Sequence, residues 1–271
     1  MSRGEPAAGG LCVGSELSVR ALSGVRTIEP GDDLLEVIVS SLARTGIDLS
    51  DGDVLVIASK IVSRAEDCFV DLASIAPSPK ALELCGEVDK DPRLVELILR
   101  ESAAISRKTT HALIVRHRLG FVAANAGIDA SNAAPSNAPP GTGPWVLTLP
   151  RDPDATAAAL CTKLAVHFGA KVGVVITDSW GRPFRRGTVG FAVGVAGLSP
   201  VWDRRGAMDR HGRVLEATEC GVADSIAAAA DLVAGQADEG RPLTLVRGLR
   251  FQHSDDSAKA LLRDPEHDLY A

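Results

Sequence analysis

The fold is decided by residues 171–198, KVGVVITDSWGRPFRRGTVGFAVGVAGL. The apolar, β-branched run at its start predicts a buried strand that ends at Thr177-Asp178-Ser179. Glycines at 187, 190, 194 and 197 punctuate a second apolar run, which predicts another strand with bends. The apolar residues of 187–198 need cover on both faces, so we expect either an ordinary internal strand or contact with a second copy of the chain.

Helices and strands follow one another on both sides of this stretch. Strands are predicted at 17–22, at 54–60 (VLVIASK), at 242–248 (PLTLVRG) and twice within 111–125, where a turn falls at His117-Arg118. Helices are predicted at about 33–45, 78–88, 91–102, 152–168 and 219–234, with Asp91-Pro92 and Asp152-Pro153 as capping signals. Residues 124–143 are too rich in Pro, Gly, Asn and Ser for a regular element, which indicates a functional loop or disorder.

The composition indicates a folded protein with one large domain. The 271 residues are 45% hydrophobic and 24% charged, close to globular averages, and the net charge of −6 without a Lys/Arg block argues against nucleic-acid or membrane-surface binding. No apolar run approaches the roughly 20 residues of a membrane helix, and the first 15 residues lack the apolar core of a signal peptide. We therefore expect a flexible tail over 1–15, a single domain of two interwoven subdomains over 16–271, and a cytoplasmic location.

Asp178 is the strongest local candidate for chemistry. A carboxylate at the carboxyl end of a buried strand is well placed to hold a divalent cation, although a helix cap or a turn would also use Asp. The segment WGRPFRRG follows at once and brings Arg182, Arg185 and Arg186 close to that carboxylate. Guanidinium groups beside a carboxylate suit a metal-bound phosphate, and a solvated basic turn is the alternative.

Two further segments carry polar groups that suit a ligand. Asp129-Ala130-Ser131-Asn132 offers hard oxygen ligands within a loop of small residues, and an Asx-turn explains the same pattern equally well. Ser59-Lys60 stands at the polar end of a predicted strand, with Arg64 four residues later, and indicates phosphate or nucleotide contact or simply surface charge.

Several familiar site patterns are missing from the sequence. It contains neither GxxxxGK[ST] nor GxGxxG, so a nucleotide site must be of another kind. The six histidines form no ligand-like pair, and the five cysteines have no CxxC spacing, which favours reduced thiols over a disulfide framework or a zinc site. No Ser/His/Asp or Cys/His arrangement indicates a covalent nucleophile.

Taken together, these segments resemble the coenzyme F420-0:L-glutamate ligases, the gamma-glutamyl ligase family, in their stand-alone form. The resemblance spans about 17–250 and rests on PGDDL (30–34), DGDVLVIASKIVSRAED (51–67), GIDASN (127–132), ITDSWGRPFRRG (176–187) and VADSIAAAADLVAGQADEGRP (222–242). It implies a mixed α/β fold of the α+β class, an intertwined homodimer, and a reaction that joins L-glutamate to the carboxylate of a deazaflavin precursor with GTP. It also implies Mg²⁺ or Mn²⁺, two ions per site, together with K⁺.

The resemblance also implies roles for particular residues. Asp129 and Asp178 would bind a divalent metal, and Ser179 and Gln236 would lie near a second one. In the reaction mechanism that we expect, arginines, Arg182 among them, would orient the phosphoryl group. The implied GTP contacts are Val25, Arg26, Thr27, Ile28, Ser59, Arg64, Asn132 and the loop 234–241, with Gly235, Gln236, Ala237, Asp238, Glu239 and Gly240. Arg64 stands where many relatives have Lys, Ser179 where Thr is frequent, and Ser225 where an acidic residue is frequent.

Two other readings of the same residues remain open. A metal-dependent phosphohydrolase would use Asp129 and Asp178 to activate water, and a non-catalytic protein would only hold a deazaflavin or a nucleotide. The number of glutamates added and the preference for GTP over other nucleotides do not follow from the sequence.

Overall fold

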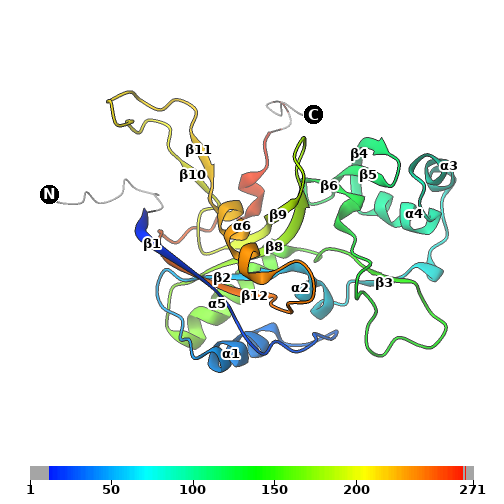
Figure 1. Ribbon diagram of the computed structural model, residues 1–271, viewed down its shortest axis with the longest axis horizontal. Helices are drawn as coiled ribbons and strands as arrows, with labels where there is room; N and C mark the ends of the chain where they lie inside the picture. The colour runs from blue at the N-terminus through cyan, green and yellow to red at the C-terminus, as the bar shows by residue number, and fades with distance from the viewer. Residues whose placement is uncertain (1–11, 265, 267–271) are drawn as a thin grey trace.

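The computed structural model describes residues 12–264 and 266, and it is built around a five-stranded mixed sheet (Figure 1). The strand order is β1 (Cys12–Ala21), β12 (Leu243–Arg250), β2 (Val54–Ala58), β8 (Gly173–Gly181) and β9 (Thr188–Ala196). β2 and β8 run parallel, and the other neighbours pair antiparallel. The sheet thus joins strands from both ends of the chain.

Both faces of the central strands are buried. Leu55 and Ile57 of β2 pack toward α1 (Leu34–Thr45) and α5 (Pro153–Phe168), whereas Val54 and Val56 pack toward α6 (Val222–Ala234). Successive side chains of a strand alternate between faces, so a continuous apolar run is what two covered faces require. The two predicted buried strands are present as β2 and β8, which begins at Gly173. The prediction that Ser59-Lys60 ends the first strand is wrong, because β2 stops at Ala58 and these two residues form the first turn of α2 (Ser59–Ala65).

The glycines of β9 allow helices to approach the strand closely. A Cβ at Gly190 would lie 2.3 Å from the carbonyl oxygen of Ala227 in α6, and one at Gly194 would lie 2.5 Å from that of Pro153 in α5. The pairing register with β8 shifts between these glycines, so they face helices on opposite sides of the sheet. β9 is thus covered by its own chain, and its apolar residues give no argument for a second copy.

The open edge of β9 is closed by two carboxylates from the first turns of the helices. Asp224 of α6 accepts a hydrogen bond from the Ala192 amide (3.0 Å). Asp154 of α5 accepts from the Val195 amide (2.9 Å) and from the Ala258 amide (2.8 Å) in the C-terminal segment. An edge strand otherwise presents free amides to other chains, so these carboxylates shield it.

A second lobe interrupts the main body. The chain leaves the sheet after α2 (Ser59–Ala65) and returns at α5, and in between it forms two small antiparallel sheets and two helices (Figure 1). These elements are β3 (Phe69–Asp71) with β7 (Trp145–Leu147), β4 (Ser102–Thr109) with β5 (Ala112–His117) and β6 (Val122–Ala124), α3 (Pro79–Val88) and α4 (Pro92–Arg100), with short 3-10 turns at Leu72–Ser74 and Asn125–Gly127. Their own apolar cluster includes Leu84, Ile98 and Val115.

A long β-hairpin projects from the main body beside α6 (Figure 1). Its base is β10 (Val201–Asp203) paired with β11 (Glu219–Gly221), and its pairing continues outward through the amide of Gly206, which donates to the Leu215 carbonyl (2.8 Å). Met208 and Val214 near its tip are 69% and 48% exposed. We call residues 201–221 the arm.

The predicted elements agree with the structure in class and mostly in position. The α+β fold is confirmed, as are the five predicted helices, although α6 begins at Val222 and residues 219–221 form β11 instead. The strand predicted at 17–22 is the second half of β1, which begins at Cys12 within the segment assigned to the tail; residues 1–11 lie outside the described part. The structure adds β3, β4, β7, β10 and β11, and within the described residues no helix has the length and apolar character of a bilayer span.

Candidate active site

Asp178 lies inside a strand, which corrects the prediction that it ends one. β8 continues through Asp178 to Gly181, so this carboxylate is neither a helix cap nor a turn residue. The neighbouring parallel strand β2 does end here, because Ala58 pairs with Thr177 and α2 begins at Ser59. Asp178 therefore lies just beyond the carboxyl end of β2, close enough to the Ser59 side chain for that side chain to lower the pKa of Asp178.

Asp129 reaches the same place from the second lobe. Its backbone exchanges hydrogen bonds with Leu147 at the end of β7 (2.9 and 2.8 Å), which fixes it at the start of the loop 129–143. Asp129 Oδ1 accepts from the amide (2.7 Å) and hydroxyl (2.8 Å) of Ser131, so the Asx-turn is present. Asp129 Oδ2 pairs with Lys60 Nζ at 2.6 Å, and the turn thus leaves one carboxylate oxygen facing a cation.

The two carboxyl groups have different pKa values because their partners differ. Burial raises the pKa of Asp178 to about 6, the Ser179 amide opposes the rise, and the negative charge of Asp129 adds to it. Burial also pushes the pKa of Asp129 upward, but the hydrogen bonds from Lys60 and Ser131 outweigh it and leave that pKa below its ordinary value. At neutral pH the cluster holds two carboxylates and one ammonium group, an excess of negative charge that suits a cation.

The carboxylate pair fits a divalent ion bound together with its substrate. Within the described residues, no group of three or more His, Cys, Asp or Glu side chains converges. A complete protein cage for an ion is therefore absent from that part of the chain. Mg²⁺ is commonly held by one or two carboxylates, substrate phosphates and water, and Asp129 with Asp178 would supply the protein share.

Ser179 joins this cluster to the end of α6. Its amide donates to Asp178 Oδ1 (2.8 Å) and its hydroxyl to Gln236 Oε1 (2.7 Å), while Gln236 Nε2 donates to Asp231. Successive residues of a strand point to opposite faces, so Ser179 turns toward α6 and Asp178 toward Asp129. Ser179 and Gln236 are thus in contact with each other, and their role at a second metal ion stays a prediction.

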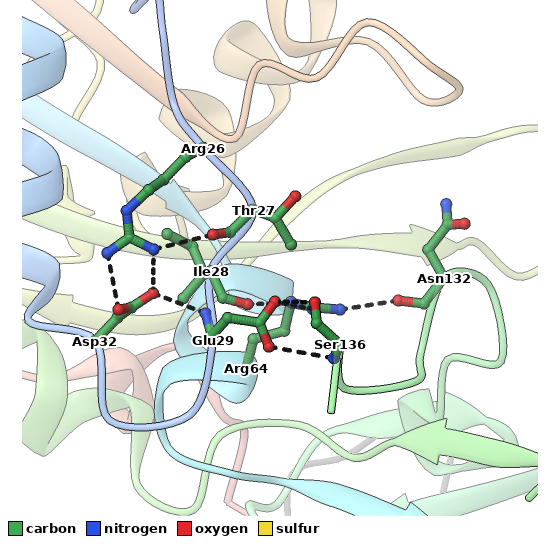
Figure 2. Close-up of polar contacts among 8 residues, drawn as sticks. All are labelled: Arg26, Thr27, Ile28, Glu29, Asp32, Arg64, Asn132 and Ser136. Carbon is green, nitrogen blue, oxygen red and sulfur yellow. Dashed lines mark hydrogen bonds and ion pairs between the residues drawn. The ribbon is translucent and has the colours of Figure 1, made fainter. Parts of the chain in front are cut away.

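The buried side chain of Arg64 contacts two segments that are distant in the sequence (Figure 2). Its Nε donates to the Ile28 carbonyl (2.6 Å), one terminal nitrogen donates to the Asn132 carbonyl (3.0 Å), and the other pairs with Glu29 (3.4 Å). The side chain is 9% exposed and lies over the Phe69 ring. The predicted nucleotide residues Ile28, Arg64 and Asn132 are thus brought together, with the guanidinium group bound to protein oxygens.

The segment 25–32 is held in place by an ion pair and by a hydrogen bond to a distant loop (Figure 2). Arg26 donates to both carboxylate oxygens of Asp32 (2.5 and 2.8 Å) and to the Thr27 carbonyl (3.0 Å), and this pairing lowers the pKa of Asp32 to about 2. Glu29 accepts from the Ser136 hydroxyl (2.5 Å), which ties the loop 129–143 to this segment. Val25 is half-buried, whereas Thr27 is exposed to solvent.

The loop after α6 is exposed from Gln236 to Gly240, which includes Ala237, Asp238 and Glu239. The Glu239 carboxylate accepts from the Ala237 amide (2.8 Å), a bond that lowers the pKa of Glu239. Gly235 has φ +82°, and a Cβ there would lie 2.2 Å from the Glu239 carboxyl carbon. Only glycine therefore lets this loop fold back on itself at the end of α6.

Arg182 lies in the turn between β8 and β9. Its terminal nitrogen donates to the Arg186 carbonyl (3.2 Å), and its Nε is buried without a partner among the described residues. Arg185 and Arg186 are exposed. The turn therefore exposes the guanidinium groups of Arg185 and Arg186 to solvent beyond the end of β8, the strand that carries Asp178.

The site also uses residues that the sequence did not single out as site members. Lys60 was noted only as part of Ser59-Lys60, and its pairing with Asp129 depends on the second lobe. Glu29 and Ser136 carry no pattern of their own, because their contact joins positions 107 residues apart.

The half-buried carboxylates Asp129 and Asp178 lie beyond the end of β2, and Asp129 pairs with Lys60. Carboxylate and ammonium groups are of the kinds that bind cations and anions in proteins. The sequence pattern of the F420-0:Gamma-glutamyl ligase family matches residues 24–248. A coenzyme F420:L-glutamate ligase of Methanothermobacter thermautotrophicus is 47% identical over 94% of this chain and 98% of its own length. Enzymes of the same name from Methanopyrus kandleri (45%, covering 90% and 94%) and Haloarcula marismortui (40%, covering 93% and 95%) are also similar. The chain belongs to the F420-0:Gamma-glutamyl ligase family.

Proposed function

We propose that this protein is a GTP-dependent ligase that joins L-glutamate to the carboxylate of coenzyme F420-0. The observation that carries the proposal is that Asp129, which pairs with Lys60, comes from the second lobe close enough to Asp178 for its charge to raise the pKa of Asp178. The names of its relatives support glutamate and F420 as substrates. The family resemblance supports GTP, Mg²⁺ or Mn²⁺, and K⁺.

Amide formation from a carboxylate and an amine is uphill in water, so the carboxylate must be activated first. In the proposed reaction an oxygen of the F420-0 carboxylate attacks the γ-phosphorus of GTP, and GDP leaves. The glutamate nitrogen then attacks the acyl carbon, phosphate leaves with the bonding electron pair, and the nitrogen loses a proton. A divalent ion, when bound, supplies charge neutralisation for the phosphate oxygens.

The residues of this chain position and neutralise the reactants. Asp129 and Asp178 would hold the divalent ion, and Ser179 with Gln236 would complete a second ion site. Lys60, which already pairs with Asp129, would contribute a positive charge beside the transferred phosphoryl group, and Arg182 would orient it. The segment 25–28 and the loop 235–240 would bind the nucleotide, with Ser59, Arg64 and Asn132 holding the site in shape.

Mass spectrometry of the product tests this function directly. Purified protein with GTP, L-glutamate, Mn²⁺ and F420-0 is expected to form F420-0 extended by glutamate, with GDP and phosphate released. Asp178→Asn should lower kcat at least about a hundredfold at saturating Mn²⁺, because a lost metal carboxylate removes several kcal/mol of charge stabilisation. Asp255→Asn, at an exposed carboxylate near the C-terminal end, is the matched control and should keep normal activity.

Two outcomes would favour the other readings. A phosphohydrolase would release GDP from GTP at the same rate with or without glutamate, whereas the ligase should need glutamate and F420-0. A binding protein would retain F420-0 without turnover, and Asp178→Asn would then leave that binding unchanged.

A further inference from the structure

The turn between β8 and β9 displays an apolar ring to solvent. Phe184 is 95% exposed, the most exposed of the large hydrophobic residues described. Its φ is +59°, a left-handed conformation that a bulky side chain rarely adopts. Exposure and backbone strain both cost free energy, and their coincidence at one residue points to a role in binding.

The neighbours of Phe184 indicate what kind of molecule it meets. Arg185 and Arg186 are exposed beside it, and Arg182 bends back so that it donates to the Arg186 carbonyl (3.2 Å). A flat apolar ring among guanidinium groups complements a ligand that has a planar aromatic ring and an anionic tail. An ordinary apolar protein surface would not match the exposed positive charges of Arg185 and Arg186.

The place of the turn agrees with such a ligand. β8 carries Asp178 and runs on to Gly181, three residues or roughly 10 Å further along the strand. Figure 1 shows the β8–β9 hairpin rising from the sheet beside β6. A ligand whose reactive carboxylate lies at Asp178 and whose ring lies at Phe184 would therefore be extended along β8.

We propose that Phe184 stacks on the deazaflavin ring of the acceptor substrate and, with Arg185 and Arg186, selects that substrate. The inference rests on the proposed function and adds a specificity-determining contact to it. Phe184 takes no part in the phosphoryl or acyl transfer, so its loss should weaken acceptor binding and leave nucleotide binding intact.

Binding of F420-0 to the full-length protein, followed by the fluorescence of the deazaflavin ring without GTP or glutamate, tests the proposal. Phe184→Ala should raise the Kd for F420-0 about tenfold, the loss expected for one ring stacked on an aromatic side chain. Phe184→Trp, which keeps a planar ring, should stay within about threefold of wild type. Val166→Ala, at an apolar residue of α5 that is 82% exposed, is the matched control and should leave the Kd unchanged.

Other results would overturn the proposal. An unchanged Kd for Phe184→Ala excludes the stacking contact, and an equal rise in the KM for GTP assigns the ring to the nucleotide. A fall in molar mass on gel filtration with light scattering assigns it to a contact between copies of the chain. The Kd is measured without turnover, so a wild-type protein that binds F420-0 but forms no glutamate adduct refutes the proposed function and leaves the stacking test valid.

Discussion

Arg64 connects three segments of the proposed nucleotide site through its contacts with protein atoms. It joins Ile28, Glu29 and Asn132, which come from segments 36, 35 and 68 residues away in the chain. A single lysine ammonium is a point charge and cannot reproduce a planar fork directed at three separate acceptors. The arginine in this chain therefore fixes the shape of the site more rigidly than a lysine would.

Arg64→Ala is expected to raise the KM for GTP about tenfold and the KM for glutamate much less, because the segment 25–28 loses its anchor. Arg64→Lys should show an intermediate rise. Initial rates at varied GTP and varied glutamate measure both constants. Arg93→Ala, which removes an ion pair with Asp91 in the second lobe, should change neither. A rise confined to glutamate would assign this segment to the amino-acid site.

Asp178 is expected to lower the stability of the metal-free protein at neutral pH. Its pKa is raised to about 6 in the folded state, whereas an unfolded carboxyl titrates at about 3.8. Above pH 6 the folded protein holds an unfavourable charge. Between pH 6 and pH 4 the folded state takes up a proton that the unfolded state does not, so this penalty disappears as the pH falls.

Asp178→Asn should therefore raise the free energy of unfolding at pH 8 by on the order of 1–3 kcal/mol while it abolishes activity. Urea unfolding in the presence of EDTA at pH 8 and pH 4.5 measures the difference, which should shrink strongly at the lower pH. A destabilised Asp178→Asn protein at pH 8 would show that the wild-type carboxylate is well compensated without a metal.

At the scale of single elements, α5 both caps itself and closes the edge of β9. Asp152 accepts from the Ala155 amide at the N-terminus of the helix, whereas Asp154, two residues later, accepts from amides of β9 and of the C-terminal segment. Asp152 therefore caps only its own helix, whereas Asp154 connects that helix to β9 and to the C-terminal segment.

Asp154→Ala should cost about 2–4 kcal/mol of unfolding free energy, because the Val195 amide of β9 and the Ala258 amide of the C-terminal segment lose their acceptor. Asp152→Ala removes a helix cap alone and should cost about 1 kcal/mol. Urea denaturation of the two variants side by side makes the comparison. Equal losses would mean that water replaces Asp154 at the edge without difficulty.

The sequence predicted those helices and strands whose formation depends on residues adjacent in the chain. Asp91-Pro92 and Asp152-Pro153 are N-caps followed by proline in the structure, as expected, because capping depends on adjacent residues. The three-residue strands β3, β7, β10 and β11 were missed, since such short segments carry no periodic pattern. The register shift in β9 was also missed, because it arises from pairing with β8.

The sequence indicated which residues are candidates for the site, but it did not indicate which of them contact one another. Asp129 and Asp178 were both singled out, yet nothing local indicated that Lys60 would pair with Asp129 from another lobe. Arg64 was expected to face phosphate, and whether an arginine meets a ligand or a distant carbonyl depends on the folded chain. The identities of site residues follow from their chemistry, whereas their partners follow from topology.

For the whole molecule we expect a homodimer. The family resemblance implies one, and the arm offers exposed Met208 and Val214 outside the main body. Interlocked interfaces commonly bury more than about 2,000 Å² and persist on dilution. Light scattering after gel filtration should give a mass near twice 28.2 kDa at every loading. A mass near 28.2 kDa at high loading would refute the dimer.

The order of strands in the sheet also affects how the protein is made. β12 lies between β1 and β2, yet it ends at Arg250, near the end of the chain. β2 ends at Ala58 and β12 begins at Leu243, so a ribosome that adds about 5–20 residues per second needs roughly 9–37 s between the two strands. During this time β1 and β2 have no partner between them, so the five-stranded sheet can be completed only after β12 has been made.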